Sequence, residues 1–182
     1  MTTQSSSDLN QLLHYELELF KKIVEITKSI ICILDLEQLL NTTVNLIRDY
    51  LDYELILIYL FDDTKKFAVA RAATGEVGRI LLDKEYKVEI SNTTLIGRCI
   101  SNEAAYIVTN RDEDIVEFQN PILPDVQSVA ILPLVHQDEV IGALEVQDFS
   151  PAFLSERDLS ALQVLADYLA IAIKNARLFG KM

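Results

Sequence analysis

The sequence is short of cysteine, of positive charge and of uninterrupted apolar stretches, and each shortage excludes a class of protein. Its two cysteines, Cys32 and Cys99, lie far apart, which gives neither a disulfide framework nor the spacing of a metal site. The 182 residues carry 16 Lys and Arg against 28 Asp and Glu, a formal charge of −12. Such a surface repels phosphate groups, and no basic cluster offsets it. We therefore expect no direct binding to nucleic acid or to anionic membranes.

Targeting segments and membrane spans are also missing. The first ten residues have neither the basic nor the apolar region of a signal peptide. A membrane span needs about 20 consecutive apolar residues, whereas the nearest candidate, Leu159–Ile173, is interrupted by Gln163 and Asp167. We therefore expect a cytoplasmic chain. Its length favours one domain, and 50% hydrophobic residues suffice for a substantial core.

Two apolar runs in the last third of the chain, Val129–Val135 and Val140–Val146, flank a polar tetrapeptide at 136–139. This pattern predicts a β-hairpin with a four-residue loop built around a type I turn. Nearly every position of both runs is apolar until Glu145. Strands of this kind are covered on both faces, so we expect the hairpin to occupy the middle of a sheet.

The remaining periodicities predict helices at the ends of the chain and clustered strands between them. A helix from Asp8 to Ile31 precedes a second helix that Asp35 caps and that runs to about Leu51. The further expected strands are Glu54–Phe61, Lys66–Ala73, Tyr86–Ile90 and Ala105–Thr109, with a loop at Gly75 and Gly78 and helices at Thr94–Asn102 and Ser155–Phe179. This order predicts an α+β fold, an antiparallel sheet with helices on one face. Residues 76–102 and 110–126 would arch over the other face and enclose a pocket.

The first helix carries a stripe at coiled-coil spacing, in steps of four and three: Leu13, Leu17, Phe20, Val24, Thr27 and Ile31. A second stripe, Ile23, Ile26 and Ile30, widens its apolar face. The helix therefore packs either on its own domain and a second copy, or on two helices of its own chain. We predict a homodimer in which terminal helices form a four-helix bundle, with Leu13, Leu17, Phe20, Val24 and Ile31 at the interface. The expected organisation is a disordered tail at 1–7, a signalling helix at 8–34 and a domain at 35–182.

Several motifs resemble those of one family. The run SVAILPLVHQDEVIGALEVQ, followed by F-L-S-E-R-D-L and LADYLAIAIKNARLF, is similar to the C-terminal half of a GAF domain. Upstream, NTTLIGRCISNEAAYIV resembles the short helix of these domains around a G-R pair, here Gly97-Arg98. The resemblance covers about Leu36–Phe179. It implies about six antiparallel strands, terminal helices on one face and a loop-covered ligand pocket on the other. It also implies a sensory role in signal transduction beside an effector domain, for example in a sensor histidine kinase of a two-component system.

Subtypes of the family make distinct demands on the sequence. Bilin-binding members need a cysteine in the loop before the hairpin, and residues 110–126 contain none. Haem binders need an axial histidine, whereas His136 is predicted in the hairpin turn and His14 on the first helix. Cyclic-nucleotide binders carry an N-K…F…D-E motif that is met only in part at Gln147-Asp148, Phe153 and Arg157-Asp158. We therefore predict neither covalent bilin nor haem and leave the cofactor unassigned.

The polar contacts of a pocket would come from the loop over it and from the short helix. We predict a ligand-binding set drawn from these segments, with Arg71 as an anion partner from the second strand: Arg71, Arg98, Tyr106, Phe118, Asn120 and Asp125.

Three functions remain open at this stage. The first is a sensory module that relays ligand binding through its terminal helices. The second is a ligand-free dimerisation module whose pocket is filled by Phe118, Ile122 and Leu123. The third is a thiol enzyme similar to the relatives that reduce free methionine sulfoxide, which requires an exposed low-pKa thiolate and a resolving partner. Both cysteines are predicted to be buried core residues, and the sequence holds no P-loop, H-E-x-x-H or Ser/His/Asp set. We therefore predict that the chain is not an enzyme.

Overall fold

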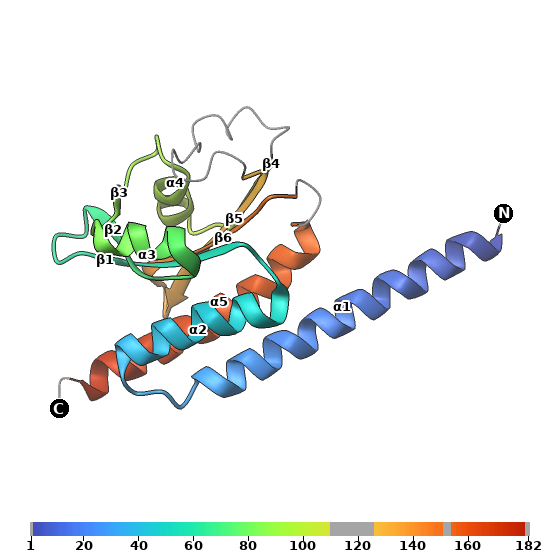
Figure 1. Cartoon of the computed structure of the whole chain (residues 1–182), viewed down its shortest axis with the longest axis horizontal. Helices are drawn as coiled ribbons and strands as arrows, with labels where there is room; N and C mark the ends of the chain where they lie inside the picture. The colour runs from blue at the N-terminus through green and yellow to red at the C-terminus, as the bar shows by residue number, and fades with distance from the viewer. Residues whose placement is uncertain (1, 110–125, 151–153, 181–182) are drawn as a thin grey trace.

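The computed structural model describes residues 2–109, 126–150 and 154–180. Within these ranges the elements follow one another along the chain as five helices and six strands (Figure 1). They are α1 (Thr2–Ile30), α2 (Leu36–Leu51), β1 (Leu55–Phe61), β2 (Phe67–Ala73), α3 (Gly75–Asp83), β3 (Lys87–Glu89), α4 (Leu95–Asn102), β4 (Tyr106–Thr109), β5 (Ser128–His136), β6 (Glu139–Asp148) and α5 (Glu156–Phe179).

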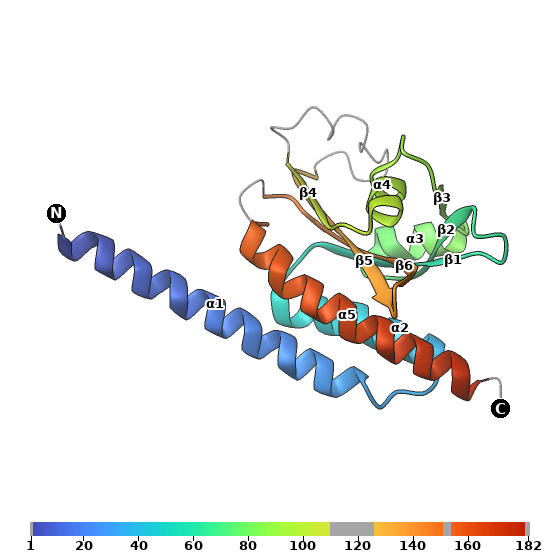
Figure 2. The same ribbon diagram turned by 180° about the vertical axis from the view of Figure 1, so that it is seen from behind.

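The six strands form one curled antiparallel sheet in the order β3-β2-β1-β6-β5-β4. The predicted hairpin β5–β6 lies inside this sheet, because β1 pairs with β6 on one side of the hairpin and β4 pairs with β5 on the other. Helices α2 and α5 lie against one face, and α3 and α4 lie on the other (Figures 1 and 2). The α+β class and the antiparallel sheet predicted from the sequence are confirmed.

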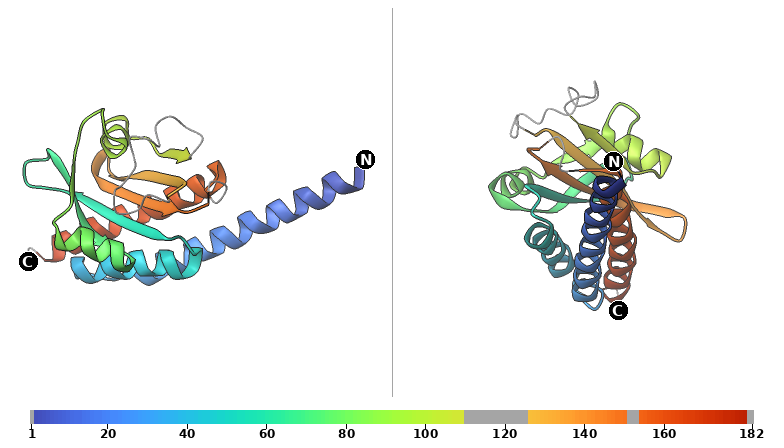
Figure 3. Two further views of the ribbon diagram at one scale, coloured as in Figure 1. Left: turned by 45° about the horizontal axis from the view of Figure 1, so that its top comes forward. Right: turned by 90° about the vertical axis from the view of Figure 1, so that its right-hand side faces the viewer.

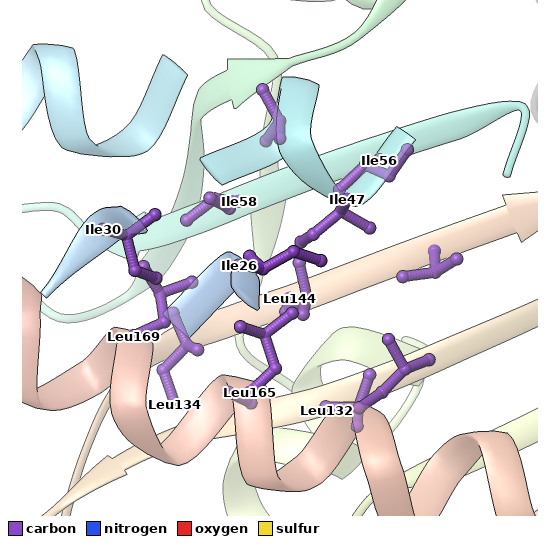
Figure 4. Close-up of a cluster of buried hydrophobic side chains, with 14 of the residues drawn as sticks. Ile26, Ile30, Ile47, Ile56, Ile58, Leu132, Leu134, Leu144, Leu165 and Leu169 are labelled. Atoms are coloured by element: carbon purple, nitrogen blue, oxygen red, sulfur yellow. The ribbon is translucent and has the colours of Figure 1, made fainter. Parts of the chain in front are cut away.

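The main core fills the space between the sheet and the helices α1, α2 and α5. From β1 it takes Ile56 and Ile58, which point toward this side because side chains alternate along a strand. Figure 4 shows them beside Ile47 of α2 and Leu165 and Leu169 of α5. Helix α1 adds Ile26 and Ile30 from outside, since it packs on α2 and α5 rather than on the strands (Figure 3).

Capping residues fix the starts of two helices where the sequence predicted them. The Asp35 carboxylate accepts a hydrogen bond of 2.7 Å from the Gln38 backbone N–H at the start of α2. At the start of α5, Ser155 and Asp158 form a reciprocal capping box. Such caps contribute about 1 kcal/mol each to helix stability.

The hairpin turn is tighter than predicted. His136 pairs with Glu139, so only Gln137 and Asp138 form the loop. Both have positive φ, 49° and 61°, which is the backbone of a two-residue type I′ turn. This turn matches the right-handed twist of the strands, whereas the predicted type I turn would splay them. His136 thus belongs to the strand and not to the turn.

Two predicted loop or tail segments are helical. Of the polar segment expected to form a disordered tail at 1–7, residues 2–7 belong to α1, which begins at Thr2. The segment at Gly75 and Gly78, expected to be a loop, is the helix α3. Gly75 has a φ of 72° at its first position, and a Cβ on Gly78 would lie 2.7 Å from the Ala73 Cβ. Both glycines therefore serve the junction of β2 with α3 rather than breaking a helix.

Candidate functional site

The sheet face under α3 and α4 is apolar except for one group of polar side chains at its centre. The residues of this second cluster include Leu55, Leu57 and Tyr59 of β1 and Ile131 of β5. Glu145 of β6 lies opposite Leu57 of β1 on one side and opposite Ile131 of β5 on the other, and 1% of its surface is exposed. A carboxyl group in such a position is rare, because its charged form loses hydration that apolar neighbours cannot replace.

Burial raises the pKa of the Glu145 carboxyl from 4.5 to about 7, although hydrogen bonds from the side chains of Gln147 and Tyr59 act in the opposite direction. The Gln147 amide nitrogen donates to Glu145 Oε1. Tyr59 is fully buried beside them, and burial together with the Glu145 charge raises the pKa of its hydroxyl well above 10. At neutral pH the Glu145 carboxyl is therefore divided between its protonated and ionised forms.

Two acceptor atoms of this polar group have no donor among the described residues. They are Oε2 of Glu145 and Oε1 of Gln147, both buried. The two residues are 2% exposed or less and stand two positions apart on one strand, so they project from the same face. Buried acceptors are normally satisfied, and each one left open costs free energy. We call Glu145, Gln147 and Tyr59 the buried polar site.

Two of the predicted ligand-binding residues lie on this same side of the sheet. Arg98 belongs to α4, whose residues Ile96 and Cys99 are part of the second cluster, and its Nε and Nη2 atoms are buried. Tyr106 packs against that cluster, and its hydroxyl accepts a hydrogen bond of 2.7 Å from Asn102. Phe118, Asn120 and Asp125 lie outside the described residues, as do Ile122 and Leu123.

Arg71 does not lie on the same side of the sheet as Arg98 and Tyr106. It is the extra residue of a bulge in β2, between Ala70 and Ala72, which pair with Tyr59 and Ile58. It lines an open groove of about 920 Å³ on the helix side of the sheet, together with Leu36 of α2 and Arg177 of α5. Burial and the neighbouring Arg71 lower the pKa of Arg177. The anion partner predicted for the pocket is thus separated from Arg98 by the sheet.

The cysteines differ from the prediction that both are buried. Cys99 of α4 is buried, and burial raises the pKa of its thiol to about 12. Cys32, however, is exposed in the connection between α1 and α2. The two thiols lie on opposite sides of the sheet, because that connection accompanies the helix layer while α4 covers the second cluster. This arrangement gives no thiolate with a nearby resolving partner.

We expect Cys32 to react with iodoacetamide at pH 8 in the native protein, while Cys99 reacts only after unfolding. The physical reason is that alkylation requires an accessible thiolate, and only Cys32 is accessible. Intact-mass spectrometry should therefore show one added group in buffer and two in denaturant. Two rapid additions in buffer would contradict the burial of Cys99.

Polar contacts clamp α1 onto the start of α5. The Tyr15 hydroxyl donates a hydrogen bond of 2.5 Å to Asp158, the same carboxylate that forms the α5 capping box. The next residue, Glu16, forms an ion pair of 2.9 Å with Arg157. Burial and the hydrogen bond to Asp158 raise the pKa of the Tyr15 hydroxyl well above its usual value of 10. The first buried side chain of α1 among those described is Leu19, so this clamp stands where the helix first meets the domain.

The predicted interface stripe of α1 is on the surface. Leu13, Leu17, Phe20 and Val24 are 42–54% exposed, whereas Ile23, Ile26 and Ile30 are buried on the other side of the helix. Ile31 lies just past the end of α1 and is partly buried. Helix α5 carries a second exposed stripe, with steps of four, three and seven residues: Val164, Tyr168, Ile171 and Leu178. Two neighbouring helices thus present apolar surface.

Sequence reasoning missed the buried polar site. Glu145 was noted only as the end of an apolar run, because a glutamate is by default expected at the surface. The buried polar site could have been found from the two polar residues Glu145 and Gln147, which stand at alternate positions of a strand predicted to be covered on both faces. Such a strand has no solvent face, so polar residues at alternate positions have to be buried together.

Within the described residues no helix is long and apolar enough to cross a membrane. The described His, Cys, Asp and Glu side chains likewise form no group of three or more that could hold a metal ion.

Comparisons with known proteins agree with this architecture. The chain matches the family described as GAF domain over residues 33–174. It is 24% identical over 176 residues to the formate hydrogenlyase transcriptional activator FhlA of Escherichia coli (strain K12), a match that covers 91% of this chain and 25% of that protein. The chain therefore spans about a quarter of the length of this curated relative.

Solved structures match over nearly the whole chain. The GAF domain of a phosphoenolpyruvate-protein phosphotransferase (ptsP) from Coxiella burnetii superposes with a TM-score of 0.80 at 22% identity, covering 92% of this chain and 99% of that one. The free methionine-R-sulfoxide reductase of Neisseria meningitidis, in complex with its substrate, gives a TM-score of 0.72 at 16% identity, covering 86% and 88%. At these identities the likeness is one of fold.

Proposed function

Because the chain belongs to the GAF domain family, whose members are regulatory and sensory modules of signalling proteins, we propose that it senses a small molecule. It would act as a cytoplasmic module of a larger regulator, such as a sensor histidine kinase, and carry no enzyme activity of its own. The single observation that supports sensing is the buried polar site, where Glu145 and Gln147 each keep an acceptor atom that no described residue supplies with a donor. An unliganded structural core has no need for such a group.

A short path connects the buried polar site with the terminal helices. Strand β6 ends at Asp148, whose carboxylate accepts a 2.7 Å hydrogen bond from the Ser150 N–H. The chain then reaches Ser155 and Asp158, the cap of α5 that also accepts the Tyr15 hydroxyl of α1. A ligand that shifts the end of β6 would therefore shift the point at which α1 and α5 are joined. A ligand biases this equilibrium only as far as it binds the two arrangements differently.

The apolar stripes on α1 and α5 support dimerisation through these helices. The α1 stripe keeps a spacing of four and three residues and the α5 stripe has steps of four, three and seven, which keep the residues of each stripe on one side of its helix, as in helices that pack together. Two copies placed with these stripes in contact would bury both of them in a four-helix bundle. Dimerisation would serve a ligand-free interaction module equally well, and this is the second candidate function.

We expect at least one compound of a panel of cyclic nucleotides, haem, amino acids and 2-oxo acids to raise the melting temperature of the protein. A ligand that binds only the folded state stabilises it by about 2.7 kcal/mol at a hundredfold excess over its Kd. Thermal-shift measurements check this, and native mass spectrometry of the purified protein would reveal a ligand that is retained. No retained mass and no shift across the panel would move the assignment to the ligand-free dimerisation module.

A further inference from the structure

Resting on the sensing function proposed above, we propose that the ligand reaches Glu145 and Gln147 with a protonated nitrogen. The site would then take small ammonium or guanidinium compounds rather than anions. This assigns a chemical class to the ligand and a contact to each of two residues that were not among those predicted from the sequence.

The two open acceptors define what the ligand has to supply. Glu145 Oε2 and Gln147 Oε1 are both oxygens, and when Glu145 is ionised only a group that donates can satisfy them. They lie on the same face of β6 at alternate positions. An ammonium group has three N–H donors, and a guanidinium has five, so one such group can bond to both oxygens. An ionised ligand carboxylate offers acceptors only and would leave both oxygens of the ionised site unsatisfied.

The surroundings of Glu145 favour a positive charge as well as a donor. The groups that act on its carboxyl are Gln147 of β6 and Tyr59 of β1, with Tyr86 near enough for the Glu145 charge to raise the pKa of its hydroxyl. None of these groups is a cation. Arg98 of α4 lies on the same side of the sheet, but its charge is not among the influences on the Glu145 pKa. Cys99 of α4, in the same cluster, is a thiol with a pKa of about 12. A buried carboxylate without a counter-charge is stabilised strongly by a cation, because the low local dielectric magnifies their attraction.

Water could also donate to the two oxygens, but it carries no charge. The binding affinity of a cation should therefore depend on pH through the ionisation of Glu145, whereas the binding of water should not. With a pKa of about 7, the ionised fraction of Glu145 rises from roughly 0.1 at pH 6 to roughly 0.9 at pH 8. A cation that stays protonated over this range should bind about tenfold more tightly at pH 8 than at pH 6. A neutral ligand held by the same oxygens has no reason to follow this profile.

The test uses three probes of matched size and different charge: n-propylammonium, 1-propanol and propionate, at constant ionic strength. Apparent affinities come from thermal-shift titrations at pH 6 and pH 8 on the wild type, on Glu145→Gln and on Glu89→Gln. Glu89 is an exposed residue of β3 and serves as the matched control. We expect n-propylammonium alone to stabilise the wild type, about tenfold more tightly at pH 8, and to lose at least about tenfold in affinity with Glu145→Gln. Glu89→Gln should behave as the wild type does.

Equal binding of n-propylammonium by Glu145→Gln and the wild type would overturn the inference, and so would a preference for propionate. Circular dichroism of Glu145→Gln confirms that its fold is intact before its affinity is compared. If n-propylammonium has no effect while a cyclic nucleotide or a 2-oxo acid stabilises the protein, the ammonium class is wrong and the sensing function stands. If neither this series nor the wider panel stabilises it, both are wrong.

Discussion

Replacing Glu145 with glutamine is expected to raise the free energy of unfolding by about 3 kcal/mol at pH 8 and by less than about 1 kcal/mol at pH 5. The carboxyl has a pKa of about 7 in the folded protein against an ordinary value of 4.5. Glutamine has a similar shape and never ionises, and its amide can also donate to Gln147 Oε1, which has no donor among the described residues. Denaturant titrations at the two pH values measure the difference.

The sign follows from the direction of the pKa change. A carboxyl whose pKa is raised by folding holds its proton more tightly in the folded state. Its contribution to stability is complete below pH 4.5 and is lost as the pH rises through 7. The wild type should therefore lose stability over this interval relative to Glu145→Gln, whereas the exposed control Glu89→Gln should follow the wild type. A gain of equal size at both pH values would show that Glu145 does not titrate as we describe.

Replacing Phe20 with aspartate is expected to weaken the proposed homodimer by at least about 100-fold while leaving the fold intact. Phe20 is 42% exposed at the centre of the α1 stripe, so its removal opens no cavity in the protomer. In a symmetric dimer the substitution occurs twice and places two unpaired carboxylates in an apolar contact. Buried aromatic residues at the centre of an interface commonly contribute 2 kcal/mol or more each. Sedimentation equilibrium measures the dissociation constant.

Gln11→Asp is the matched control for this experiment. Gln11 is exposed on α1 but lies outside the stripe. The substitution Gln11→Asp therefore adds the same negative charge as Phe20→Asp, but outside the proposed interface. Its dimer should associate as the wild type does. A wild-type protein that sediments only as a monomer at high concentration would contradict the bundle, and so would a Phe20→Asp dimer of unchanged affinity.

The assignment of β1 side chains to the two faces of the sheet follows from the alternation of side chains along a strand. This alternation separated Ile56, Ile58 and Leu60 from Leu55, Leu57 and Tyr59, and the structure places these sets in the two clusters on opposite faces of the sheet. Alternation is reliable here because a slip of one residue would turn every side chain of β1 to the wrong face. The antiparallel sheet was predictable from the order of the elements, because the strands cluster between helices at the two ends of the chain.

The helix α3 shows where local signals fail. Val77, Ile80 and Leu81 have helical spacing, but nine residues give a short pattern, and two glycines in it normally indicate a loop. The reason for Gly78 is tertiary, since Ala73 leaves no room for a Cβ. Likewise, Arg71 could not be assigned to a face from the sequence, because the bulge at this residue interrupts the alternation of β2.

The position of the Tyr15 clamp gives α1 the properties of a lever. Residues Thr2–His14 of α1 precede Tyr15, and at 1.5 Å per residue they extend about 20 Å beyond this clamp, as the projecting part of the helix in Figure 1 illustrates. A tilt of about 10° at the fulcrum displaces the far end by about 4 Å. A change in the tilt of α1 at the contact with Asp158 would therefore displace Thr2 more than any residue of α1 nearer the clamp.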